Sequence, residues 1–275
     1  MKKLLLVCFA LIAIAAGAQT KGKIDVYDFG SFKLHIYHNN DTMNDQSFIF
    51  EGKTGLIDME LPLFKDNMAE FQAYEKKLNK PVIKSITDYH LGGTADEDII
   101  MPEGMPTFIK GDIYGGMMNG FQKRYGDSMV SLPTGKTVEV PFGSTETWDG
   151  IKFQFLKGVS GDFPAATIIV NKKVYYTHMA FSKAHMTQIN SVAEIDTKIA
   201  ETKSALKTGC ELFAGNHGSE VKKDVVEFRL AYLKNMKKLV AQNKTADAFV
   251  AAMKSAYPGL DGEKGLDNLA KNLYK

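Results

Sequence analysis

Cysteine is almost absent from this sequence: its 275 residues contain two, Cys8 and Cys210. Cys8 lies in an N-terminal apolar segment that we expect to be removed, so the mature chain would have one cysteine and no internal disulfide. A disulfide-stapled scaffold is therefore excluded. Cys210 precedes a largely apolar stretch, which is typical of a buried small hydrophobe and argues against a nucleophilic thiol.

The sequence also lacks an excess of charge of either sign. Its formal net charge is +2, from 34 basic and 32 acidic residues, and loss of Lys2 and Lys3 with the N-terminal segment would bring it to zero. A neutral protein is a poor match for nucleic acid or an anionic membrane, so we expect no nucleic-acid partner. The predicted partner is a small-molecule substrate or ligand, and no oligomeric state is predicted.

Long apolar runs are missing except at the N-terminus. Met1-Lys2-Lys3 precede an apolar run over residues 4–16, and Ala16-Gly17-Ala18 has the small residues of a cleavage site. The run is too short for a permanent membrane anchor. We therefore predict that residues 1–18 are a signal peptide, cleaved before Gln19, and that the protein is secreted or periplasmic.

Low-complexity linkers and repeats of fixed period are lacking too, because glycine and proline are spread evenly along the chain. The length of residues 19–275 suits one large domain or two fused halves, and the even composition favours one domain.

Alternating apolar residues predict strands in the first half of the chain, over residues 32–37, 46–51 and 54–59. The last two would form a hairpin around Gly52-Lys53. Apolar residues at helical spacing predict a helix over Asn67–Leu78, which leads to a β-branched strand over Val82–Thr87. This strand–helix–strand order indicates parallel pairing and an α/β layer architecture.

The second half repeats the arrangement. Short strands are predicted at residues 107–110, 136–140, 146–148, 152–156, 166–170, 173–177 and 211–214, and helices at 192–206 and 221–242. Residues 114–129 are rich in glycine, methionine and aromatic residues, and they predict either a helix packed on the core or a flap near a site. Each half thus predicts a β-layer with helices behind it.

Polar residues follow the strand that ends at Thr87. Asp88, Tyr89 and His90 lead into Gly92-Gly93, which permit a tight turn. A strand that delivers Asp and His into a glycine-rich loop presents metal ligands or acid–base groups. The simpler alternative is that Asp88 caps a helix and His90 makes a hydrogen bond within the loop.

Three further strand ends carry a ligand-type residue. Asp162 lies in the turn over residues 161–166, His178 follows Tyr176-Thr177, and His217 lies within Gly215–Gly218. Each alone is weak, because a histidine after a strand is usually a satisfied polar side chain. Their order and spacing strengthen the prediction of one site.

These segments resemble landmarks of the metallo-β-lactamase-fold superfamily over nearly the whole mature chain. Residues 45–58 resemble its opening hairpin with the Leu-Ile-Asp turn, and residues 86–90 resemble the strand that enters its His-x-His-x-Asp-His loop. Residues 161–166, 174–178 and 216–218 resemble its Gly-His-Thr-Pro-Gly-Ser turn, Thr-Gly-Asp strand end and Gly-His-Gly. The resemblance implies an α/β (α+β) fold, the four-layer αββα sandwich of the metallo-β-lactamase type.

The metal-binding motif is degenerate by comparison with that family. Either Asp88 and His90 replace the two histidines of His-x-His, or His90 aligns with the last histidine of the loop and the other ligands are lost. Asp162 occupies a histidine position, His178 lies within one residue of the bridging aspartate, and His217 matches directly. A dinuclear zinc site is therefore not expected.

The resemblance instead implies a mononuclear site with His90, Asp162, His178 and His217 as the predicted metal ligands. The predicted ion is one divalent metal, zinc first, with iron or manganese if carboxylates join the set, and a site without metal is the remaining alternative. Asp88 and Tyr89 are the predicted catalytic residues, with Tyr89 as a donor to a developing oxyanion. Asp58 would orient the loop.

Two functions follow from the resemblance. One is an exported hydrolase that attacks an ester, lactone or amide with a metal-bound hydroxide. The alternative is a catalytically inactive relative that binds a small molecule. The ligand-type side chains at the expected strand ends favour the hydrolase, because an unpaired buried charge is costly to retain.

Overall fold

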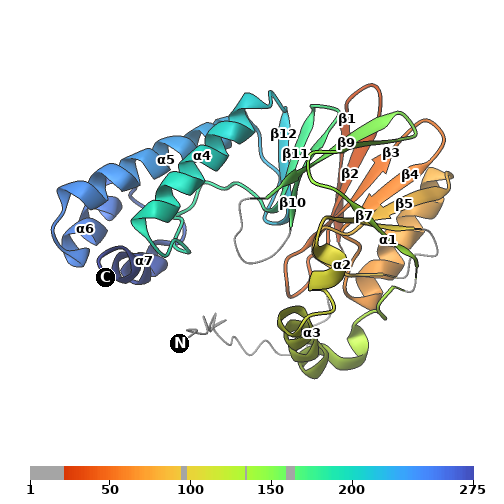
Figure 1. The fold of residues 1–275 in the computed structure, drawn as a ribbon, viewed down its shortest axis with the longest axis horizontal. Coiled ribbons are helices and arrows are strands. Elements are labelled where there is room, and N and C mark those ends of the chain that lie inside the picture. Colours follow the sequence, from red (N-terminus) through yellow and green to blue (C-terminus); the bar gives the residue numbers. More distant parts are fainter. Residues whose placement is uncertain (1–21, 94–97, 134, 159–164) are drawn as a thin grey trace.

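The computed structural model of the protein describes residues 22–93, 98–133, 135–158 and 165–275. Seven of its strands form one sheet (Figure 1), in the order β1 (Lys23–Asp28), β2 (Lys33–His38), β3 (Gln46–Glu51), β4 (Leu56–Met59), β5 (Val82–Ile86), β6 (Ile99–Pro102) and β7 (Thr137–Val140). Neighbours from β1 to β4 pair antiparallel, and neighbours from β4 to β7 pair parallel. The parallel half contains the crossover helix that the sequence predicts.

The second sheet has five strands, in the order β12 (Leu212–His217), β11 (Val174–Met179), β10 (Ala166–Val170), β9 (Ile151–Lys157) and β8 (Thr145–Trp148). The two neighbours β11 and β12 run parallel, whereas the other pairs are antiparallel. Because β11 and β12 are parallel neighbours, their carboxyl ends meet at one edge of the sheet.

The main core lies between the two sheets, and the alternation of side chains along each strand builds it. In β3, Phe48 and Phe50 face the second sheet, whereas Ile49 between them packs on the other side. In β11, Tyr176 contributes to the same core, whereas Tyr175 faces outward. Each sheet is thus apolar on both faces and must be covered by helices.

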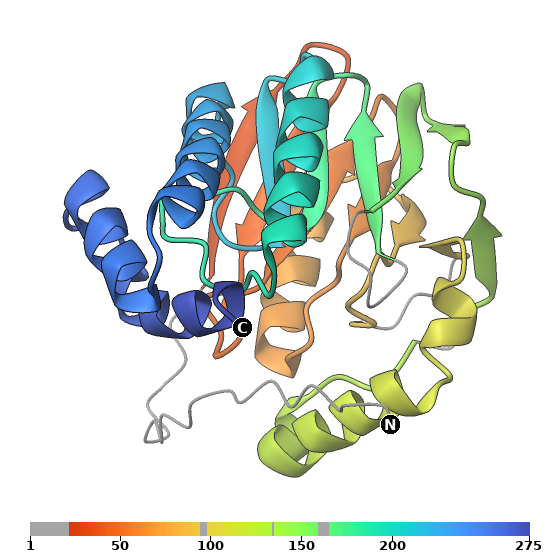
Figure 2. The same ribbon diagram turned by 60° about the vertical axis from the view of Figure 1, so that its left-hand side comes forward.

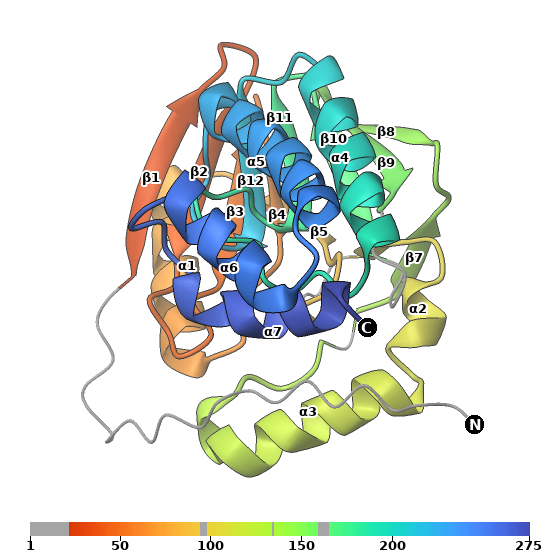
Figure 3. The same ribbon diagram turned by 90° about the vertical axis from the view of Figure 1, so that its left-hand side faces the viewer.

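The helices provide this cover. Helix α1 (Lys65–Leu78) packs Met68 and Phe71 against the outer face of the seven-stranded sheet. Helices α4 (Val192–Lys207) and α5 (Lys223–Gln242) lie over the outer face of the five-stranded sheet (Figure 3). The order of layers is helix, sheet, sheet, helix, and the prediction of an αββα sandwich is confirmed.

The C-terminal part forms a second apolar core. Helices α6 (Ala246–Ala256) and α7 (Leu266–Leu273) pack against the far ends of α4 and α5, around Tyr232, Met236 and Phe249 (Figure 1). A short 3₁₀ turn over Glu263–Gly265 precedes α7. None of the helices in the described ranges is long and apolar enough to cross a membrane.

Two helices occupy one end of the sandwich (Figure 2): α2 (Met105–Phe108) and α3 (Asp112–Tyr125), which continues in a 3₁₀ turn over Gly126–Ser128. Of the two alternatives for residues 114–129, a helix or a flap, the structure has a helix, whereas the strand predicted at 107–110 is wrong. Gly104 has a left-handed conformation with φ 81° and Pro106 follows in the first turn, so this segment begins a helix.

Candidate metal centre

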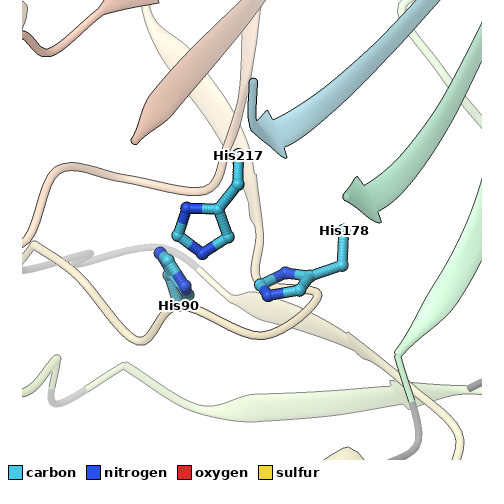
Figure 4. Close-up of side chains that lie close together, drawn as sticks. All are labelled: His90, His178 and His217. Carbon is cyan, nitrogen blue, oxygen red and sulfur yellow. The ribbon is translucent and has the colours of Figure 1, made fainter. Parts of the chain in front are cut away.

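Three histidines from three different segments converge at one edge of the sandwich. His178 and His217 lie at the carboxyl ends of β11 and β12, and His90 lies in the loop that follows β5. Figure 4 shows the three imidazole rings turned toward one another. One nitrogen from each ring lies within 4.8 Å of the other two. We call these residues the three-histidine cluster.

The carboxylate of Asp45 lies behind two of these rings. Its Oδ1 is 2.9 Å from Nδ1 of His217, and its Oδ2 is 3.3 Å from Nδ1 of His90. Asp45 also forms an isolated β-bridge with His217, which fixes its backbone beside β12. Because Nδ1 of both rings faces Asp45, Nε2 is the atom left to bind a metal. A carboxylate behind a metal-binding histidine sets its tautomer and raises its basicity.

The loop that carries His90 is held by Glu60. This carboxylate accepts the backbone N–H groups of Asp88 at 2.5 Å, Tyr89 at 3.1 Å and His90 at 3.1 Å. Glu60 is buried and has a positive φ of 54°, which is uncommon for a residue other than glycine. This uncommon backbone conformation places the carboxylate where it accepts three N–H groups of the loop.

The protonation of the cluster suits a metal. Burial, and then the neighbouring His90 and His217, lower the pKa of His178 to about 2, so its ring is neutral at ordinary pH. Burial opposes a charge on His90 as well, but Asp45 and Glu60 outweigh it and raise the pKa of His90 above its usual value. Hydrogen bonds from both histidines overcome burial and hold the pKa of Asp45 well below its usual range.

The predicted site residues occupy different places. His90, His178 and His217 come together, whereas Asp162 lies outside the described residues. Asp88 is fully buried and accepts the N–H of Ala166 through Oδ1. Burial and the charge of Glu60 raise the pKa of Asp88 well above its usual value.

Tyr89 packs beside the cluster, with its ring centroid 4.7 Å from that of His178. Its hydroxyl donates to Sδ of Met117 in α3 at 3.5 Å, and burial raises its pKa. Its backbone carbonyl accepts the hydroxyl of Tyr114, so α3 also holds this loop. The catalytic roles of Asp88 and Tyr89 stay predictions.

Sequence reasoning missed Asp45 and Glu60. It assigned the loop-orienting role to Asp58, but the carboxylate that accepts the three loop N–H groups is that of Glu60, two residues further on. Both missed acids border a strand: Asp45 precedes β3 and Glu60 follows β4. That position was the available signal, since the same criterion identified Asp88 and His178.

The donor set fits one divalent metal. Three imidazoles leave one position open in a tetrahedral site, as in catalytic zinc centres.

Comparisons with known proteins identify the fold. No family model matches the sequence, and no curated protein sequence matches it. Among solved structures, the stereoselective inverting sec-alkylsulfatase Pisa1 from Pseudomonas sp. aligns with 91% of this chain and 50% of its own, at 13% identity and a TM-score of 0.58. This chain thus spans about half the length of that alkylsulfatase.

Two further structures have similar folds. The DIM-1 metallo-β-lactamase aligns over 78% of this chain and 98% of its own, at 11% identity and a TM-score of 0.51. A variant of a flavo di-iron protein from Thermotoga maritima aligns over 90% of this chain and 77% of its own, at 10% identity and a TM-score of 0.50. Such low identities establish a shared fold and leave the chemistry to the residues of this chain.

Proposed function

Because the chain has the metallo-β-lactamase fold, we propose that it is an exported hydrolase that holds one divalent metal on His90, His178 and His217 and cleaves an ester, lactone or amide. The convergence of three histidine nitrogens within 4.8 Å, with Asp45 behind two of the rings, is the observation that carries this proposal. A carboxylate in that place prepares histidines to bind metal through Nε2.

When bound, the ion would polarise a substrate oxygen and lower the pKa of a water molecule toward neutrality. Asp45 would keep the protons of His90 and His217 on Nδ1. Glu60 would hold the loop of His90 in place through three N–H groups. Both carboxylates therefore act by positioning.

Tyr89 would donate a hydrogen bond to the developing oxyanion. Burial raises the pKa of Tyr89, so its hydroxyl keeps the proton it would donate. One acceptor of this hydroxyl in the structure is a methionine sulfur, which is a weaker acceptor than a substrate oxygen.

Zinc is the proposed metal, because an all-imidazole set suits zinc better than manganese. Of the two carboxylates that would favour a harder ion, Asp88 accepts the N–H of Ala166 through Oδ1, and Asp162 lies outside the described residues. Iron, which also accepts imidazole, is the second choice.

The test has two parts, metal content and turnover. Elemental analysis and zinc titration of the purified protein should show that His178→Gln loses one zinc equivalent. His185→Gln is the matched control, because it removes another buried imidazole that bonds Tyr232 away from the cluster. Zinc should raise the melting temperature of the unsubstituted protein and of the control by mass action, after a chelator has removed any metal.

Turnover is measured on a panel of carboxylic esters, lactones and amides, with a sulfate ester added because one protein of this fold is a sec-alkylsulfatase. Zinc-dependent hydrolysis lost in His178→Gln supports the hydrolase. Zinc bound by this cluster without turnover on any substrate would favour the non-catalytic binding protein instead. If His178→Gln binds as much zinc as the control, the proposed site is wrong.

A further inference from the structure

A second group of metal-binding side chains lies where the edges of the two sheets meet. Asp25 is in β1, His38 is in β2, and Glu220 follows β12. Strands β1 and β12 are the edge strands of their sheets. One ligand atom from each residue lies within 4.8 Å of the other two. We call these residues the edge cluster.

The two donor pairs that include His38 have separations close to those that a metal requires. Nε2 of His38 is 3.1 Å from Oδ2 of Asp25 and 3.5 Å from Oε2 of Glu220. Bonds of about 2.0–2.2 Å in a tetrahedral site would separate the donor atoms by about 3.3–3.6 Å. Small movements of the side chains would therefore accommodate an ion.

One carboxylate oxygen of Glu220 is buried and has no hydrogen bond from the described residues. The side chain is 7% exposed, and its Oε1 accepts the hydroxyl of Tyr27 at 2.6 Å. Its Oε2 is buried, faces His38, and has no hydrogen bond from the residues that the structure describes. A buried carboxylate oxygen without a hydrogen bond is costly unless it binds something.

The cluster borders a surface cavity of about 340 Å³, which gives a hydrated ion access to it. Asn40, Asn44 and Ser219 also line this cavity and offer further oxygen atoms. Asp45 lines it as well, so the cavity lies directly behind the three-histidine cluster.

Gln46 can set the tautomer of His38 that a metal needs. Its Nε2 lies 3.1 Å from Nδ1 of His38, whereas its Oε1 is buried and makes no hydrogen bond within the described part of the chain. The two ends of an amide are interchangeable by rotation. A rotated Gln46 would accept the proton of Nδ1 and leave Nε2 of His38 as a ligand.

We propose that Asp25, His38 and Glu220 bind one divalent transition-metal ion, zinc or manganese, at a site separate from the three-histidine cluster. One imidazole and two carboxylates form a harder donor set than three imidazoles, so manganese competes better here. The ion would tie β1 and β2 of one sheet to the segment after β12 of the other. This site does not depend on the hydrolase activity.

The test uses His178→Gln as the background, because this variant removes the first site. Zinc and manganese are titrated separately into chelated protein, and stoichiometry is measured by equilibrium dialysis with elemental analysis. We expect one equivalent in the background variant. Adding Glu220→Gln should weaken binding by at least about tenfold, because it removes one of the two carboxylate ligands and leaves Asp25 and His38.

Glu51→Gln is the matched control, since Glu51 pairs with His35 at 3.0 Å but lacks a third ligand nearby among the described residues. It should leave the affinity unchanged. Zinc should also raise the melting temperature of the background variant and not that of the Glu220→Gln double variant. If the latter does not fold, His38→Gln replaces it in the same assays.

Two results would overturn the proposal. One is that the background variant binds neither ion. The other is that Glu51→Gln and Glu220→Gln weaken binding equally. In either case hydrogen bonding between His38 and the two carboxylates, without an ion, would explain the cluster.

Discussion

In the three-histidine cluster the carboxylate of Asp45 lies behind the imidazoles, whereas in the edge cluster the carboxylates of Asp25 and Glu220 face the same point as the imidazole of His38. An ion on three neutral imidazoles keeps its full positive charge and can act on substrate and water. An ion between two carboxylates is largely neutralised. The same residue types therefore suit chemistry in one place and cross-linking in the other.

The supports of the two clusters differ too. Each cluster takes two of its residues from regular strands, but the third residue of the three-histidine cluster, His90, lies in a loop that Glu60 holds through three N–H groups. The position of His90 therefore depends on Glu60, whereas Asp25 and His38 of the edge cluster depend on the pairing of β1 with β2.

Glu60→Gln should give the largest effect and should separate the clusters. The glutamine oxygen can still accept from Asp88 and Tyr89, but its amide nitrogen would face the N–H of His90. Loss of a charged acceptor for buried N–H groups should lower the free energy of unfolding by about 3 kcal/mol. Zinc affinity should fall at the three-histidine cluster and not at the edge cluster.

Chemical denaturation in chelator measures this change, with Glu139→Gln as the control. Glu139 accepts one N–H, from Gly104, at an exposed position, so its substitution should cost less than about 0.5 kcal/mol. Equal losses in the two variants would show that Glu60 does not hold the loop.

Asp45→Asn should lower the zinc affinity of the three-histidine cluster by about 10–100-fold. An asparagine cannot accept from His90 and His217 at once, so one ring would lose its orienting partner. The edge cluster, whose ligands do not include Asp45, should keep its affinity. Titration of the Glu220→Gln variant isolates the first site, and an unchanged affinity there would contradict the positioning role of Asp45.

Several strands and helices were predictable because their determinants are local, whereas the αββα arrangement came from the resemblance. The alternation of Phe48 and Phe50 with Ile49 gives the two faces of β3 from the sequence alone. His90, His178 and His217 could each be recognised at a strand end. Their convergence follows from the order of strands in two sheets, which the resemblance to the metallo-β-lactamase fold supplied.

Asp45, Glu60 and the edge cluster were not predictable in this way. Their roles depend on which buried groups they meet, and those partners are distant in sequence. Tyr27 and Glu220, for example, are 193 residues apart, and β1 was not predicted as a strand. Only tertiary structure brings such residues together.

The pH dependence of stability in chelator, without metal, should show that His178 stays neutral in the folded chain. Its pKa is about 2 in the folded chain and near 6.5 when unfolded, so the unfolded chain gains protons first as the pH falls. Its contribution to stability is therefore present above pH 6.5 and is lost as the pH falls through this window. The raised pKa of His90 has the opposite effect on stability, because its contribution is lost as the pH rises above about 6.5.

His178→Gln should remove the part of the pH dependence that His178 causes. That part is a loss of about 1.5 kcal/mol in the free energy of unfolding between pH 6.5 and pH 5. Denaturation of the variant and the unsubstituted protein in chelator, at these two pH values, measures the difference. Parallel pH dependences would mean that His178 takes up its proton in the folded state, which disagrees with its burial between two other histidines.

Lys23→Ala should have the smallest effect and the opposite direction, a gain of metal affinity at the edge cluster. The ammonium of Lys23 donates to Oδ2 of Asp25 at 2.8 Å, the oxygen that also faces His38. A metal would compete with this ammonium for the oxygen. Because exposed ion pairs are weak, removal of Lys23 should raise the zinc affinity by only about two- to fivefold.

The measurement is a zinc titration in the His178→Gln background, with Lys33→Ala as the control. Lys33 is an exposed lysine of the neighbouring β2, so its loss changes the net charge equally without touching Asp25. The gain should shrink as salt is added, because salt screens the exposed ion pair between Lys23 and Asp25 and so weakens its competition with the metal. An equal gain in both variants would show a general effect of charge, whereas a gain confined to Lys23→Ala places the ion on Asp25.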